Sequence, residues 1–206
     1  MVERWPNVAR LIVDYAHEKS SKRNKKDVEL EGRLKKWSWL PQNTQALLLL
    51  PVVFDASKVP NSKIKKDNID RCFFDFIQFE EKKTFEMLLE LSQQSLNKLV
   101  GKKESTITPR VVLHGKNVQT ARPFVVLTES TYYKASDLIE AVDSCYKVIK
   151  GLYMISKFGK PIPHVWCFLE KFVYEIHDEH DGYKGVDILI GNLERIRDFK
   201  SSIVDN

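Results

Sequence analysis

Residues 110–134 read RVVLHGKNVQTARPFVVLTESTYYK, and this stretch decides the fold class. Two short valine-rich runs, at 108–113 and 123–128, flank a connection that contains Gly115 and Asn117. A third short run, with two tyrosines, follows at 131–134. β-Branched and aromatic residues bounded by glycine, asparagine and serine are typical of strands joined by tight turns. The pattern predicts a small antiparallel β meander.

Directly after the meander, apolar residues recur at the spacing of a helix. Ser136 can cap this helix, and Asp137 and Glu140 in its first turn favour the positive end of the helix dipole. Two further helices are expected at 163–177 and 185–196. We therefore expect residues 105–206 to form a compact α+β unit of three strands followed by three helices.

Helical periodicity also dominates the first half of the chain. We expect helices near 5–18, 28–39 and 67–100, and a polar loop at 55–66. Charged residues at 80–83 interrupt the last of these helical tracts, which predicts a bend or a helix pair there. Residues 1–104 are accordingly interpreted as a basic helical region. The whole chain is expected to be an α+β protein, mainly α-helical with a small antiparallel β meander.

The most apolar segment, LLLLPVVF at 47–54, is compatible with two structures. Four leucines suit a buried helical turn that Pro51 ends, whereas the following Val52 and Val53 suit an extended segment. Periodicity does not decide between these alternatives, because the segment is short.

The sequence also bears on where the protein works. The apolar stretch at 46–54 is too short to cross the hydrocarbon core of a bilayer. The N-terminus carries Glu3, Arg4 and Arg10 around its first apolar residues, which is not the arrangement of a secretory signal. We therefore expect an intracellular protein, cytoplasmic or nuclear, with no membrane partner.

The net charge of +5 is distributed unevenly. Residues 1–103 contain 20 basic and 14 acidic side chains, and residues 104–206 contain 13 and 14. Clustered cations beside aromatic residues such as Trp37 and Trp39 can bind phosphates and stack on bases. The candidate nucleic-acid-binding residues are Lys22, Arg23, Lys25, Lys26, Arg33, Lys35, Lys36, Lys63, Lys65 and Lys66.

Motifs with specific chemistry are not found. The three cysteines, Cys72, Cys145 and Cys167, are widely spaced, and neither a nucleophile elbow nor a phosphate-binding glycine loop occurs. We therefore expect no catalytic residue, no enzyme activity and no cofactor. His177 and His180 share a helical spacing and are weak candidates for metal ligands.

Three segments of the second half carry a resemblance. They are RPFVVLTE at 122–129, ASDLIEAVDSCYK at 135–147 and the aromatic helix at 163–176. Together they resemble the C-terminal region of a broad set of uncharacterised animal proteins, over about residues 106–196. Some of those proteins are similar to sterile-alpha-motif-containing proteins and others to products of mobile elements. The resemblance implies a possible mobile-element origin but no known activity and no catalytic residue, and residues 1–100 contain no sterile alpha motif.

Two hypotheses of function follow from these observations. The first is a non-catalytic protein–protein interaction or assembly module, which binds a protein partner or a second copy of itself through helical apolar surface left over from the core. The alternative is a nucleic-acid-associated protein that binds the phosphate backbone through its basic N-terminal half.

Overall fold

The computed structural model divides into two compact units. Unit 1 comprises Met1–Ile69 and Ile162–Asn206, and unit 2 comprises Asp70–Pro161. This division differs from the expected boundary at 104/105, because the last helices of the chain pack with the first ones. The residues that the structure describes are 1, 3–21, 27–56, 76–79, 84–100, 109–128, 130–156, 164–176 and 184–204.

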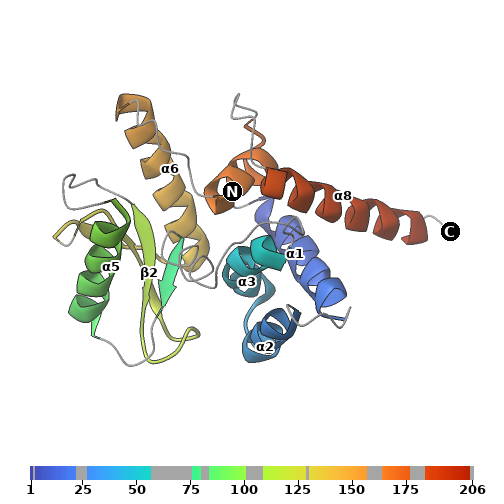
Figure 1. Ribbon diagram of the computed structural model, residues 1–206, viewed down its shortest axis with the longest axis horizontal. Coiled ribbons are helices and arrows are strands. Elements are labelled where there is room, and N and C mark those ends of the chain that lie inside the picture. Colours follow the sequence, from blue (N-terminus) through green and yellow to red (C-terminus); the bar gives the residue numbers. More distant parts are fainter. Residues whose placement is uncertain are drawn as a thin grey trace. The chain divides into compact units, whose positions relative to one another are not determined.

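All secondary-structure elements described in unit 1 are helical (Figure 1). Its elements are α1 (Trp5–Ser20), α2 (Asp27–Trp37), α3 (Gln42–Ala56), α7 (His164–Phe168), the π-helical segment η1 (Leu169–Val173) and α8 (Lys184–Val204). Helix α3 packs against each of the four α-helices, most extensively against α1. The indole nitrogen of Trp5 donates a hydrogen bond of 3.2 Å to the carbonyl oxygen of Asn43, which joins the start of α1 to the start of α3.

Helix α3 forms the centre of unit 1. Every residue from 45 to 54 is buried. Residues 46–54 are all apolar, so this part of the helix is apolar around its whole circumference, as expected of a helix surrounded by others. The helix continues through Pro51 to Ala56, so the expectation that Pro51 ends it, with an extended segment after it, is wrong. A proline inside a helix costs about 3 kcal/mol. Burying three large side chains from 52 to 54 contributes about 1.5–3 kcal/mol each, which outweighs that cost.

Unit 2 is an α+β arrangement built on a four-stranded sheet. Its elements are β1 (Ile77–Phe79), α5 (Phe85–Val100), β2 (Arg110–His114), β3 (Arg122–Val126), β4 (Tyr132–Lys134) and α6 (Leu138–Ser156). The strands lie in the order β1-β2-β3-β4. β2, β3 and β4 form the predicted antiparallel meander, with Val112 opposite Phe124 and Val125 opposite Tyr133.

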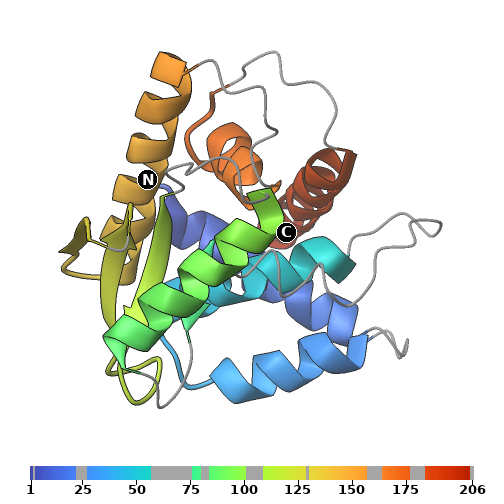
Figure 2. The same cartoon turned by 60° about the vertical axis from the view of Figure 1, so that its left-hand side comes forward.

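Helices cover both faces of this sheet, with α5 on one side and α6 on the other (Figure 2). On the α5 side, Leu88 and Leu89 form a buried cluster with Val112 and Val126. Alternate residues of a strand point to opposite faces, so Val111 and Val125, which are also fully buried, lie on the α6 side of the sheet. Unit 2 thus has a core layer on each side of its sheet.

The mainly helical α+β class is confirmed, but two details of the prediction are wrong. The sheet is mixed and not purely antiparallel, because β1 pairs with β2 in parallel. Residues 77–79 form this strand, although a helix was expected over 67–100. Residues 67–75 and 80–83 of that expected helix lie outside the described residues. Helix α5 follows β1 among the described residues, and at its start the hydroxyl of Thr84 accepts a hydrogen bond of 3.3 Å from the backbone N–H of Met87.

The cap of α6 lies one residue later than predicted. The carboxylate of Asp137, and not the hydroxyl of Ser136, accepts a hydrogen bond from the backbone N–H of Glu140, at 2.8 Å. The Glu140 carboxylate in turn accepts hydrogen bonds from the hydroxyl and the backbone N–H of Ser136, and these bonds lower the pKa of Glu140. Glu140 therefore ties the end of the meander to the first turn of α6.

A close backbone approach explains the glycine between β2 and β3. A Cβ atom at Gly115 would lie 2.6 Å from the Cα of Ala121, well inside van der Waals contact. We expect Gly115→Ala to lower the free energy of unfolding by about 1–3 kcal/mol, as overpacking does elsewhere. Urea denaturation followed by circular dichroism measures this effect, and Lys116→Ala on the same connection is the matched control. An unchanged midpoint for Gly115→Ala would show that the connection opens without cost.

Candidate functional site

Most of the predicted basic residues lie outside the described part of the chain. These are Lys22, Arg23, Lys25, Lys26, Lys63, Lys65 and Lys66. The structure places the other three, Arg33, Lys35 and Lys36, on α2. The nucleic-acid interface as a whole therefore stays a prediction.

The side chains of Arg33 and Lys35 each contact another residue of α2, and the backbone of Lys36 accepts a hydrogen bond from a residue just beyond the helix. The ammonium of Lys35 lies 2.6 Å from the carboxylate of Glu31, and this hydrogen bond lowers the pKa of Glu31. The guanidinium of Arg33 lies 5.5 Å from the ring centroid of Trp37. The carbonyl oxygen of Lys36 accepts a hydrogen bond of 2.8 Å from the indole of Trp39.

The charges of α2 also balance along the helix. Its sequence, DVELEGRLKKW, places three acidic residues before three basic ones. This order suits the helix dipole, which favours anions at the first turn and cations at the last. Of the two aromatic residues beside these cations, Trp37 is buried and Trp39 is 50% exposed.

The candidate metal ligands His177 and His180 lie outside the described residues. Among the residues that are described, no group of three histidine, cysteine or acidic side chains could hold a metal ion. The ring of His164 stacks against Phe54, with centroids 6.4 Å apart, and Cys167, one turn later, is buried. Cys145 is buried as well.

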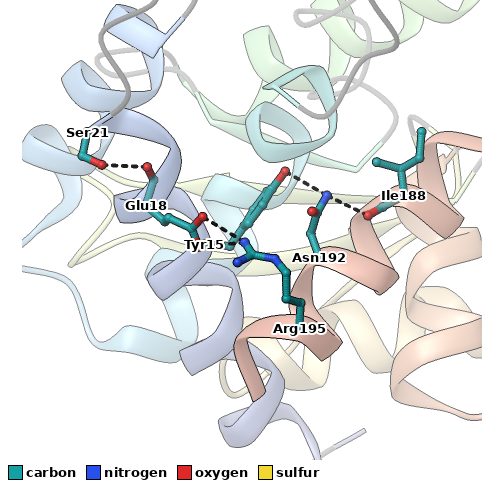
Figure 3. A network of polar contacts seen from close by, with 6 residues as sticks. All are labelled: Tyr15, Glu18, Ser21, Ile188, Asn192 and Arg195. Atoms are coloured by element: carbon teal, nitrogen blue, oxygen red, sulfur yellow. Dashed lines mark hydrogen bonds and ion pairs between the residues drawn. The ribbon is translucent and has the colours of Figure 1, made fainter. Parts of the chain in front are cut away.

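A polar seam joins α1 to α8 in unit 1 (Figure 3). The carboxylate of Glu18 accepts hydrogen bonds of 2.9 and 3.0 Å from Arg195. The amide of Asn192 lies 3.3 Å from the hydroxyl of Tyr15 and 2.8 Å from the carbonyl oxygen of Ile188. These side chains hold the two helices together, so this surface of α8 is already occupied within the unit.

The same seam interrupts the apolar surface that α8 could offer to a partner. Ile188 and Phe199 are 37% and 66% exposed. They lie eleven residues apart, which places them on the same line of the helix. Asn192 and Arg195 lie between them on that line and contact α1. The helical surface expected to bind a partner is therefore not one continuous apolar patch on α8.

Strand β4 is an exposed element of unit 2. It lies at the end of the sheet, and all three of its residues are exposed. Strand β1, at the opposite end, differs because Ile77 and Gln78 are buried. A strand at the end of a sheet offers unpaired backbone groups to another chain. Among the described strands, β4 therefore forms the accessible edge of the sheet.

Backbone hydrogen bonds define which groups of β4 point outwards. The N–H of Leu127 donates to the carbonyl of Thr131, and the N–H of Ala135 donates to the carbonyl of Pro123. Hydrogen-bonded pairs alternate along an antiparallel ladder, so Tyr133, midway between them, also bonds towards β3. The N–H and C=O groups of Tyr132 and Lys134 consequently point away from the sheet.

Aromatic rings support the open edge on the α5 side of the sheet. The ring of Phe85 lies 4.9 Å from that of Tyr132 and 4.5 Å from that of Phe124, measured between centroids. His114 completes the group, 5.4 Å from Phe85. Tyr132 remains 47% exposed although it belongs to this cluster. The cluster therefore holds one tyrosine rigidly at the edge, with half of its surface available.

The other face of β4 carries the second tyrosine. Tyr133 is 38% exposed and lies close enough to Lys147 of α6 to help raise the pKa of that lysine. The main cause of this raised pKa is the hydrogen bond that Lys147 donates to Asp143, at 2.7 Å. Both faces of β4 thus combine an aromatic ring with a nearby cation, because Lys134 stands beside Tyr132 on the first face.

The sequence pattern identified β4 as a strand but not as a candidate site. A signal was present, because two consecutive tyrosines in a strand place one ring on each face. The helix that starts at Leu138 also makes β4 the last strand of the meander.

Comparisons with known proteins assign no family and no function to this chain. No protein-family model matches the chain, and neither a curated protein nor a solved structure shows significant similarity to it. In the described part of the chain, no helix is both long and apolar enough to span a membrane.

Proposed function

We propose that this chain is a protein-interaction module that takes an extended segment of another polypeptide as a fifth strand beside β4. The observation that carries the proposal is the exposed edge formed by Tyr132–Lys134 at the end of the sheet. In this mode of recognition, main-chain hydrogen bonds supply affinity and side-chain contacts supply specificity.

The side chains of the edge suit this role. Tyrosine adds a large and rigid contact surface and loses little conformational entropy on binding, which is why it is enriched at interfaces. Tyr132 is held by Phe85, so its ring is already ordered before a partner binds. Short edge strands and edge lysines also serve to limit unwanted pairing, and the three-residue length of β4 favours a weak, reversible interaction.

A displayed library of random ten-residue peptides tests the proposal directly. We expect enriched peptides to bind the full chain, and Lys134→Pro to weaken that binding at least about tenfold, because it removes an outward N–H from the edge. Lys134→Ala is the matched control, since it removes the same side chain but keeps the N–H, and its affinity should change by less than about threefold. Circular dichroism checks that both variants fold.

Two results would contradict the capture of foreign peptide segments at β4. One is a library from which no peptide is enriched over the starting pool. The other is a set of peptides that bind Lys134→Pro as tightly as the unmodified chain, because such peptides must use another surface.

A further inference from the structure

The geometry of β4 points to a second copy of this chain as its partner. We infer that two β4 strands pair antiparallel around a two-fold axis at Tyr133, which joins two four-stranded sheets into one of eight strands. The inference rests on the proposed strand capture at β4 and names its partner.

The outward backbone groups select this register. Tyr132 and Lys134 both direct their N–H and C=O groups away from the sheet, as the ladder between β3 and β4 requires. With the axis at Tyr133, Tyr132 of one copy lies opposite Lys134 of the other. Both residues then form hydrogen-bonded pairs, and every residue of both short strands lies opposite a residue of the other copy.

The two neighbouring registers that also use the outward backbone groups are less favourable. An axis at Lys134 would place two lysines directly opposite each other, and like charges in that position are destabilising. An axis at Tyr132 would pair Lys134 with Ser130 of the other copy, which lies before the strand begins. The register centred on Tyr133 avoids both problems.

Side-chain chemistry is complementary in this register. On the α5 side, the ammonium of Lys134 approaches the ring of Tyr132 of the other copy, and the two-fold axis repeats this contact. A lysine over a tyrosine ring is attractive. On the opposite face the two Tyr133 rings meet at the axis, where exposed aromatic rings form favourable cross-strand pairs. The edge is therefore self-complementary, as a two-fold interface must be.

Cysteine cross-linking tests the register. Residues paired at the axis without hydrogen bonds have Cα atoms about 4.5 Å apart, within the range of about 4.4–6.8 Å that a disulfide spans. Tyr133→Cys should therefore form a covalent dimer on mild oxidation. Tyr132→Cys and Lys134→Cys should each form no covalent dimer alone but should cross-link to each other when mixed. The unmodified chain, with its own three cysteines, is the background control.

A pair of charge variants measures the same contact without cross-linking. Tyr132→Glu and Tyr132→Lys both remove the ring, but only the first places an opposite charge next to Lys134 of the other copy. We expect Tyr132→Glu to dimerise about tenfold more strongly than Tyr132→Lys, because the two-fold axis doubles the effect. Sedimentation equilibrium over a concentration series gives both dissociation constants, and circular dichroism checks folding.

The outcomes separate this inference from the proposed function. Dimers without cross-linking at Tyr133→Cys, or charge variants with equal dissociation constants, would overturn the register. A chain that stays monomeric, while library peptides bind in a manner sensitive to Lys134→Pro, would overturn the second copy as partner and leave strand capture standing. Covalent dimers in the expected register, with no peptide enriched, would mean that β4 accepts its own copy but not foreign segments.

Discussion

Replacing Leu49 with alanine is expected to lower the free energy of unfolding by about 2–5 kcal/mol, the range for large-to-small changes in a well-packed core. Leu49 is fully buried in the middle of α3, the helix that contacts the four other described α-helices of unit 1. The helices around α3 cannot all move inwards at once, so a cavity remains where the side chain was. Its volume adds to the lost transfer free energy.

The tryptophans provide a specific probe for this change. All four, Trp5, Trp37, Trp39 and Trp166, belong to unit 1, and three of them are buried. Tryptophan fluorescence during urea denaturation therefore follows the unfolding of unit 1. We expect a lower midpoint with an unchanged slope, since the surface exposed on unfolding hardly changes.

Two variants of α3 serve as controls for Leu49→Ala. Leu49→Met keeps the side-chain volume and should cost less than about 1.5 kcal/mol. Gln42→Ala changes an exposed residue of the same helix and should stay within about 0.5 kcal/mol. If Leu49→Ala were no more destabilising than Gln42→Ala, α3 would not be the centre of the core.

The parts of the fold that the sequence predicted are those determined by near neighbours. Strands β2 to β4 are close together in the chain, so alternation and turn residues were enough to identify them. Helices α1 and α6 carry their apolar residues at regular spacing; α1 was expected within a few residues of its bounds, and α6 directly after the meander. Local patterns suffice when an element and its partner are adjacent in sequence.

The wrong predictions involve partners that are distant in sequence. Ile77–Phe79 lies in a tract whose apolar spacing predicts a helix, but its pairing with Val111–Leu113 stabilises a strand. Pro51 would end an isolated helix, yet burial against α1 and other helices keeps α3 intact. Tertiary contacts override local propensity in both cases. The boundary between units depends in the same way on contacts between α1 and α8.

The candidate site could be predicted only in part, for a related reason. A strand with two tyrosines was evident, but its exposure depends on which strand ends the sheet and on what covers the edge. β1 is also an end strand, yet it is buried. The sequence contains no local signal that separates these two edges. Conversely, Lys35 belongs to a basic cluster in the sequence, whereas in space its nearest charge is Glu31.

Stability at high pH is expected to depend on Cys145. Burial raises the pKa of this thiol well above its ordinary value of 9.0, and the positive charge of Arg110 only partly opposes the increase. Above pH 9 the thiol therefore ionises in the unfolded chain but stays protonated in the folded one. Stability that is complete below pH 9 is lost as the pH rises, by about 1.4 kcal/mol per pH unit.

The variant Cys145→Ala isolates this contribution, because it leaves every other titrating group in place. Between pH 9 and pH 11 the unmodified chain should lose about 2.3 kcal/mol more stability than Cys145→Ala. Urea denaturation followed by circular dichroism under reducing conditions measures both. Cys145→Ser, whose hydroxyl does not ionise in this range, should follow Cys145→Ala. Parallel pH profiles for the unmodified chain and Cys145→Ala would show that the thiol ionises as readily in the folded protein, and hence that water reaches it beneath α6.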